Sequence, residues 1–296
     1  MPDYTKHPGA FRIVFLASCA LLAFAGNSVL CRMALGEGAI DAASFTGIRL
    51  VSGAVALSLV LKLSARADSI TKRGSWLSAA ALFCYAAAFS FAYLTLSTGT
   101  GALILFGAVQ LTMIGAALLA GERLRRTEGA GICLAFGGLV YLVAPGVTAP
   151  SLTGSLLMTC AGIAWGIYSL RGRSSSAPLA ETTYNFILTL PLTVLLIIYF
   201  SKDCHLSAAG ILLAILSGGL ASGVGYAVWY AALQGMTATR AAIVQLVVPL
   251  LAALGGVLFL AEGLSLRLVI AAAAILGGVG LAMVGQSGAP ATRPPV

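Results

Sequence analysis

The stretch RAAIVQLVVPLLAALGGVLFLAEGLSL, residues 240–266, is long and apolar enough to cross a lipid bilayer. It carries an amide, Gln245, and a proline, Pro249, near its middle, and a carboxylate, Glu262, near its end. A proline frees the carbonyl four residues earlier, which here belongs to Gln245. Lipid cannot satisfy that carbonyl, but a neighbouring helix or a water-filled cavity can. The stretch therefore predicts a membrane helix that borders protein or water, with Pro249 as either a static kink or a moving hinge.

The whole chain has the composition of an integral membrane protein. Of its 296 residues 59% are hydrophobic and only 9% are charged, whereas soluble domains carry roughly a quarter charged residues. The net charge of +8 is confined to short connections, so we interpret it as a topology signal and expect no nucleic-acid partner. The six cysteines form no paired motif and both histidines lie outside the apolar segments. We therefore expect no disulfide, no metal site and no cofactor.

Ten segments are long and apolar enough to span the hydrocarbon core of a bilayer. Each consists largely of hydrophobic and small residues, and together they cover residues 11–34, 42–63, 76–97, 101–120, 127–144, 152–171, 181–200, 208–234, 240–261 and 266–285. We expect an all-α integral membrane protein of ten transmembrane helices, with an N-terminal segment at 1–10 and a disordered tail at 289–296.

The lysines and arginines predict how the segments are oriented, because basic residues favour cytoplasmic connections. A cytoplasmic N-terminus places thirteen of the 17 basic residues on the cytoplasmic side. It leaves Arg32, Lys202 and Arg267 on the other side and Arg49 within a helix. Both termini are therefore expected in the cytoplasm.

The two halves of the chain repeat each other. FAGNSVLC from Phe24 corresponds to WGIYSLRG from Trp165, and FSFAYLTL from Phe89 corresponds to YAVWYAAL from Tyr226. Five helices in each half is an odd number, so the second copy must be inverted in the membrane. We expect the first repeat at 11–147, the second at 148–288, and a central cavity between them, which is where secondary transporters of this architecture bind substrate.

These features resemble the drug/metabolite transporter superfamily of the EamA type. The resemblance rests on the ten segments, the two five-helix halves, the aromatic-small-x-Asn opening around Asn27 and the spacing from Pro249 to Glu262. The sequence is most similar to the aromatic amino-acid exporters of the YddG type. That likeness implies export across a bacterial inner membrane. One departure is that Val109 stands where the first half would match Pro249.

Deep aromatic residues are candidates for the walls of a substrate pocket. Tyr85 and Phe89 follow a helical spacing on one stripe, and Trp165 and Tyr226 occupy other predicted helices. Tryptophan and tyrosine also gather at the membrane interface, and Trp76 fits that alternative. Tyr85 and Phe89 lie too deep for it, and Tyr226 lies inside its long segment.

Polar residues inside the segments are candidates for holding the substrate. Asn27, Gln110 and Gln245 could bond an amino-acid backbone, although a buried amide often only bonds a neighbouring helix. Arg49 could take a substrate carboxylate, or it could instead satisfy carbonyls at a helix end.

Two glutamates, Glu122 and Glu262, stand between helices at corresponding places in the two halves. An acidic side chain there can cap the helix that follows it. We expect this structural role for both, with Arg125, Arg126 or Arg267 nearby.

Taken together, the residues predict an exporter of amino acids, aromatic or large neutral, and related metabolites that works by alternating access. Alternatives are an exporter of other amphipathic solutes or drugs, and a membrane scaffold without transport. No carboxylate lies in the middle of a segment, which argues against exchange of cations for protons. No catalytic motif is visible, so we expect no enzyme. The expected partners are a small-molecule substrate and the lipid bilayer, and a monomer is plausible.

The topology can be tested by labelling introduced cysteines in intact cells. A cysteine near Arg125 should react only with reagent supplied on the cytoplasmic side, and one near Arg267 only with reagent supplied outside. Reaction of both cysteines from the same side would contradict the assignment of ten helices.

Overall fold

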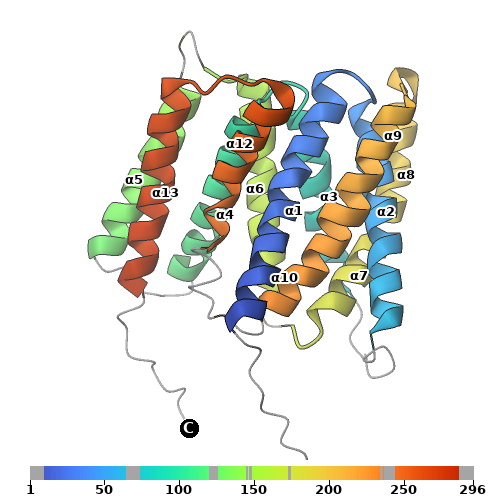
Figure 1. The fold of residues 1–296 in the computed structure, drawn as a ribbon, viewed down its shortest axis with the longest axis horizontal. Helices are drawn as coiled ribbons and strands as arrows, with labels where there is room; N and C mark the ends of the chain where they lie inside the picture. Colours follow the sequence, from blue (N-terminus) through green and yellow to red (C-terminus); the bar gives the residue numbers. More distant parts are fainter. Residues whose placement is uncertain are drawn as a thin grey trace, which may run out of the picture.

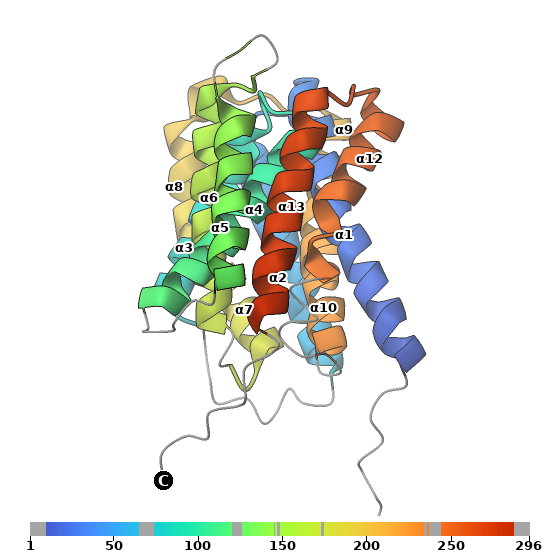
Figure 2. The same cartoon turned by 90° about the vertical axis from the view of Figure 1, so that its left-hand side faces the viewer.

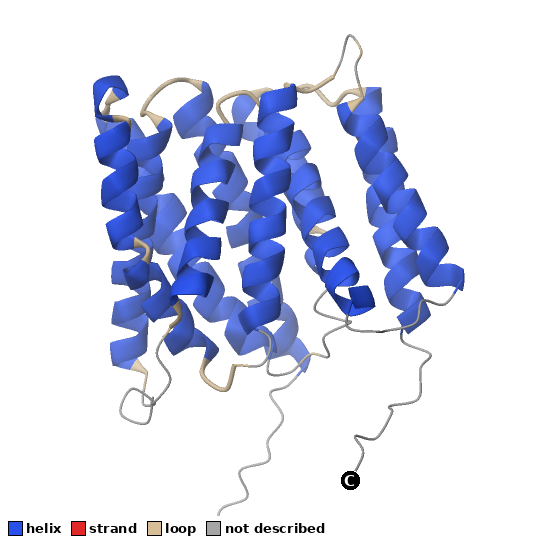
Figure 3. Ribbon diagram, turned by 180° about the vertical axis from the view of Figure 1, so that it is seen from behind, coloured by secondary structure: helices blue, strands red, loops and turns tan. Residues whose placement is uncertain are grey.

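The computed structural model describes residues 10–64, 74–119, 126–144, 146, 149–172, 175–233, 236 and 244–286. These residues form a bundle of helices that run side by side (Figure 1). Within them the only strand-like pairing is a single bridge between Ile40 and Leu206, so the helical ribbon dominates every view (Figure 3). The first helix begins and the last helix ends at the lower end of Figure 1. We call this the lower end of the bundle and the opposite one the upper end.

Each predicted segment contains helical residues. The elements are α1 (Ala10–Gly36), α2 (Ala42–Leu63), α3 (Trp76–Ala92), α4 (Thr98–Leu119), α5 (Arg126–Val143), α6 (Leu152–Gly172), α7 (Pro178–Leu188), α8 (Leu190–Tyr199), the short turn η2 (Ser201–Asp203), α9 (Ala208–Ile215), the π-helical η3 (Leu216–Val224), α10 (Gly225–Leu233), α12 (Val248–Leu260) and α13 (Leu266–Gln286). The tail at 289–296, Glu122 and nearly all of segment 1–10 lie outside the described residues.

The helices have the length and polarity of membrane spans. In the described part of the chain six helical stretches are long and apolar enough to cross a bilayer by length and composition, and four shorter apolar helices accompany them. Large apolar side chains are exposed on the outer faces of the helices, as lipid-facing residues would be. An all-helical membrane protein is therefore confirmed.

Three of the predicted segments are interrupted rather than continuous. The segment 181–200 breaks at Thr189, two residues before Pro191, because a proline ring clashes with a continuing helix. The segment 208–234 contains the π-helical stretch η3, which is rich in glycine and serine. The third interruption lies in the segment 240–261.

That segment does not carry its proline in mid-helix. Gln245 belongs to a short helical piece, a turn follows at 246–247, and Pro249 is the second residue of α12. A proline in a first turn loses no helical hydrogen bond, since N–H groups there have no partner within the helix. The expectation of one kinked helix over 240–261 is thus corrected to a break before α12. Residues 240–243 lie outside the described range.

A capped turn at the upper end joins segments far apart in the sequence. The Asp41 carboxylate accepts hydrogen bonds from the backbone N–H groups of Ser44, at 2.8 Å, and His205, at 3.0 Å. Burial raises the pKa of Asp41, but these hydrogen bonds outweigh it and hold the pKa below its usual value. The cap fixes the start of α2 against the connection that precedes α9.

Helices α5 and α13 form a closely packed pair at one edge of the bundle (Figure 2). Gly131 and Gly278 face each other, and a Cβ on Gly278 would lie 2.5 Å from the carbonyl oxygen of Gly131. Small residues let membrane helices approach to backbone contact in this way. The pair is attached to the rest of the bundle mainly through α4.

The glycine contact gives a stability prediction with a matched control. Gly278→Ala should lower the free energy of unfolding by about 1–3 kcal/mol, because the new methyl group meets backbone atoms that cannot move aside. Gly277→Ala, one residue earlier, finds open space and should be neutral or slightly stabilising. Thermal unfolding in detergent measures both, and equal unfolding temperatures for the two variants would contradict this packing.

Candidate functional site

A cluster of aromatic rings fills the middle of the bundle. Trp165 of α6 lies at its centre, with ring centroids 4.8 Å from Tyr85 of α3, 5.2 Å from Tyr226 of α10 and 5.4 Å from Tyr168. The rings of Tyr168 and Tyr226 are both close to parallel with the indole, which is a stacked arrangement. Three helices that are far apart in the sequence therefore present flat apolar faces to one another.

Further rings extend this group in three directions. Phe89 packs on Tyr85 at 5.4 Å, while Phe24 of α1 and Phe186 of α7 pack on Tyr226 at 5.7 and 6.1 Å. We call the set the aromatic cluster: Phe24, Tyr85, Phe89, Trp165, Tyr168, Phe186 and Tyr226. The structure thus brings together all four rings that the sequence analysis predicted as pocket walls.

Arg49 places a positive charge beside the aromatic cluster. It lies on α2 about 10 Å from the start of that helix, and only 2% of its surface is exposed. Its Nη2 donates a 2.9 Å hydrogen bond to the Tyr85 hydroxyl, and its guanidinium lies over the Phe89 and Tyr85 rings at 4.8 and 5.2 Å. The expectation that it satisfies carbonyls at a helix end is not met, because no such bond is found within the described residues.

The arginine carries an unsatisfied donor. Among the residues described, its Nη1 has no hydrogen-bond partner. Charged side chains within a membrane cost about 2.5–3.5 kcal/mol on insertion scales and are normally paired. A ring face and one hydroxyl compensate the charge only in part.

The three predicted amides occupy different places. Asn27 is buried on α1, where its Oδ1 accepts a 2.6 Å hydrogen bond from the Ser217 hydroxyl of η3, so the alternative of a bond between helices is the one observed. It lies one helical turn from Phe24. Gln110 is buried on α4 and Gln245 is half-buried before α12. No hydrogen bond among the described residues connects these amides to the rings.

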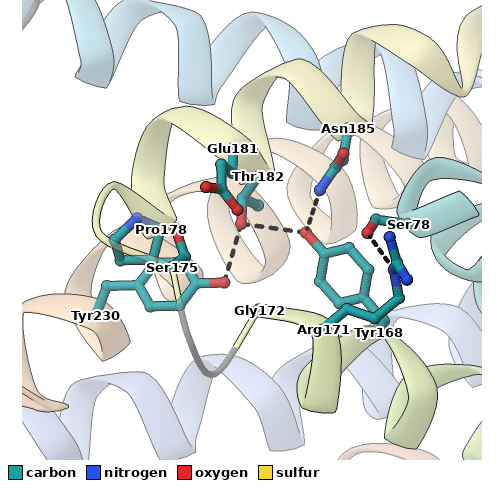
Figure 4. Close-up of a pocket in the computed structure, with 10 residues that line it drawn as sticks. All are labelled: Ser78, Tyr168, Arg171, Gly172, Ser175, Pro178, Glu181, Thr182, Asn185 and Tyr230. Atoms are coloured by element: carbon teal, nitrogen blue, oxygen red, sulfur yellow. Dashed lines mark hydrogen bonds between the residues drawn. The ribbon is translucent and has the colours of Figure 1, made fainter. Parts of the chain in front are cut away.

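A polar hollow lies between the aromatic cluster and the lower end (Figure 4). Its volume of about 20 Å³ is enough for one or two waters. Thr182 connects the Tyr168 and Tyr230 hydroxyls at 3.1 and 2.9 Å. Tyr168 therefore belongs both to the ring stack and to the wall of this hollow.

Charged groups line the rim of the hollow. Arg171 donates hydrogen bonds to the hydroxyls of Ser78, at 3.0 Å, and Ser75, at 3.2 Å. Glu181, in the first turn of α7, is on the same rim. Asn185 joins the α3 start to α7 by accepting from the Ser75 N–H at 2.9 Å. Both signs of charge and several hydroxyls thus face one small space.

The upper end is closed by ionic and backbone contacts. The Glu262 carboxylate accepts from the Thr98 N–H at the start of α4, at 2.8 Å, and pairs with Arg32 of α1 at 3.4 Å. Arg32 also donates to the Tyr93 carbonyl at 3.0 Å. The prediction that Glu262 caps a helix is right in kind, but the helix is α4 rather than the following α13.

Glu262 pairs with Arg32 and not with Arg267, which the sequence analysis expected nearby. Arg267 instead lies over the Tyr141 ring at 5.5 Å, and Ser265 caps α13 through the Leu268 N–H. The connection allows this because Ala261 adopts a left-handed conformation, with φ of 51°, and turns the chain sharply after α12. That turn directs Glu262 back toward α4.

Sequence analysis did not identify several residues of the site. Phe24 and Phe186 were not assigned to a pocket, because single phenylalanines in apolar helices give no periodic signal. The polar network of Thr182, Asn185 and Tyr230 was also missed. Its signal was present in the run ETTYN at 181–185, a group of polar residues at the start of the segment 181–200.

Comparison with known proteins gives one family. Residues 152–284 match the EamA-like transporter family. The chain is 53% identical over 277 residues to an uncharacterized protein of Pseudomonas aeruginosa, covering 94% of this chain and 96% of that protein. It is 28% identical over 191 residues to an uncharacterized transporter of Archaeoglobus fulgidus, covering 62% and 67% of the two chains.

A solved structure shares the fold. A protein known by its crystal structure superposes with a TM-score of 0.61 at 22% sequence identity, covering 90% of this chain and 98% of its own. At that identity the likeness concerns the fold alone.

The closure of the upper end can be tested through Glu262. Glu262→Ala removes the acceptor for the Thr98 N–H and the partner of Arg32, so it should lower the free energy of unfolding by about 1–2 kcal/mol. Glu37→Ala, an exposed carboxylate at the same end, is the control and should change little. Thermal unfolding would contradict the assignment if both variants matched the wild type.

Proposed function

We propose that this chain is a transporter of the EamA-like family, whose model its residues 152–284 match, and that it exports aromatic or large neutral amino acids and related metabolites. The aromatic cluster beside Arg49 carries the proposal. Stacked rings recognise flat apolar bodies, and a guanidinium recognises a carboxylate. An aromatic amino acid presents both groups, and the resemblance to the YddG exporters points to the same substrate class.

We propose that ten spans form two inverted repeats, 11–147 and 148–288. The packing supports this, because a contact between two helices has a matching contact between the corresponding helices of the other half. Contact of α1 with α9, η3 and α10 corresponds to contact of α6 with α3, while α4 with α12 and α5 with α13 each pair a helix with its own counterpart. A two-fold relation within the membrane would produce this pattern.

We propose that transport proceeds by alternating access, and the difference between the two ends of the bundle supports this proposal. The upper end is held by Arg32, Glu262 and the α4 backbone, whereas the lower end contains the polar hollow next to Tyr168. With both termini in the cytoplasm, the hollow would be the entry side for a substrate leaving the cell. The protein would lie in the inner membrane of a bacterium, with the lower end of the bundle on the cytoplasmic side.

The substrate should move without proton coupling. No carboxylate lies deep in the described helices to share a proton with the substrate, since Glu181 and Glu262 both lie near helix ends. The gradient of the substrate itself would then drive net movement.

Counterflow in proteoliposomes tests the proposal. Vesicles loaded with phenylalanine should accumulate radiolabelled phenylalanine without an imposed pH gradient. Trp165→Ala should raise the substrate concentration needed for half-maximal uptake by about tenfold, because it removes the central stacking surface of the cluster. Trp76→Ala, on an exposed position at the start of α3, is the matched control and should transport normally. Absence of counterflow, or an absolute need for a pH gradient, would contradict the proposal.

A further inference from the structure

Arg49 is a buried charge whose hydrogen-bonding capacity is only partly used. Its guanidinium has five N–H donors, and the described residues give it one hydrogen bond, to Tyr85, and contact with two rings. The Nη1 group is buried and unpaired among the described residues. Buried arginines that serve only a structural role are normally satisfied by carboxylates or carbonyls.

Within the described residues no carboxylate is paired with this charge. The acidic residues among them lie in connections or in the first turn of a helix. Within the described residues the one ion pair joins Arg32 to Glu262 at the upper end. Arginine stays protonated at any ordinary pH, so it cannot become neutral to avoid the cost of burial.

The surroundings of the guanidinium indicate the shape of the missing partner. The guanidinium lies over the rings of Phe89 and Tyr85. Tyr85 is also in contact with Trp165, which stacks on Tyr226. A group that reaches Nη1 from within the cluster would carry its own apolar body among these rings. The Tyr85 hydroxyl holds the other side of the fork at 2.9 Å and so fixes its orientation.

We infer that Arg49 is the anion anchor of the transport site, and that its physiological ligand carries a carboxylate attached to an aromatic or similarly bulky apolar group. This deepens the proposed function and rests on it for the assignment of transport. On this inference, amines and amides of the same size that lack a carboxylate are poor ligands. The arginine is then a group that the protein carries at a cost to its stability until substrate arrives.

Ligand-induced thermal stabilisation of the full-length protein in detergent tests the anchor without relying on transport. The probes are phenylalanine and phenylacetate, their amides phenylalaninamide and phenylacetamide, and acetate as a carboxylate without a ring. The wild type should bind each ring-bearing acid at least about tenfold more tightly than its amide, because the amide cannot form the charge-assisted pair. Acetate should stabilise it least.

Variants separate this role from a structural one. Arg49→Gln should bring the ratio of acid to amide affinity close to one, and its unliganded form should unfold at the same temperature as the wild type or higher. Arg49→Lys keeps the charge but loses the fork, so it should retain part of the ratio. Arg12→Gln, which removes an exposed arginine in the first turn of α1, should leave the ratio unchanged.

The inference is overturned if acids and amides bind the wild type equally, even where phenylalanine counterflow is observed. It is also overturned if Arg49→Gln keeps the preference for acids, or if acetate stabilises as strongly as phenylacetate. If counterflow is absent but the protein still prefers acids to amides and Arg49→Gln removes that preference, the transport proposal is contradicted. The role of Arg49 as the anion anchor is then still supported. If Arg49→Gln does not fold, the ratio of acid to amide affinity in Arg49→Lys decides. A ratio equal to that of the wild type would contradict the inference.

Discussion

The contact between the Arg49 guanidinium and the rings of Tyr85 and Phe89 is the interaction on which this account depends. A charge is costly in an apolar bundle, and arginine cannot discharge it by losing a proton. The ring faces and one hydroxyl lower that cost without removing it. The position of every other ring then matters, because the stack through Trp165 determines what can approach the guanidinium.

The two ends of the bundle differ in how they are held together. At the upper end one carboxylate, Glu262, both caps α4 and pairs with Arg32, so a single side chain joins α1, α4 and α12. At the lower end, the Arg171 guanidinium donates to the hydroxyls of Ser78 and Ser75 beside a small hollow, and the described residues form no ion pair there. In the transport cycle that we propose, the lower end would be the easier one to open, because the ion pair among the described residues lies at the upper end.

Much of the fold could be predicted from sequence because membrane insertion imposes strong constraints. The apolar segments follow from composition, and the rings of Tyr85 and Phe89 share a face because of their spacing. The close contact of Gly131 with Gly278 was not predicted, because composition does not say which helices pair. The sequence analysis placed Pro249 in mid-helix, whereas it lies in the first turn of α12. A proline in an apolar run gives the same sequence pattern in both positions. The partner of Glu262 was missed because a left-handed turn at Ala261, with no glycine to signal it, redirects the chain.

A crystal structure with bound 4-bromophenylalanine would test whether Arg49 and the aromatic cluster bind the substrate, because bromine can be located by its anomalous scattering. We expect one bromine peak among the rings of Tyr85, Trp165 and Tyr226, with the ligand carboxylate within hydrogen-bond distance of Nη1 of Arg49. A bromine peak in the hollow beside Arg171, with the aromatic cluster unchanged and Nη1 still unpaired, would contradict it.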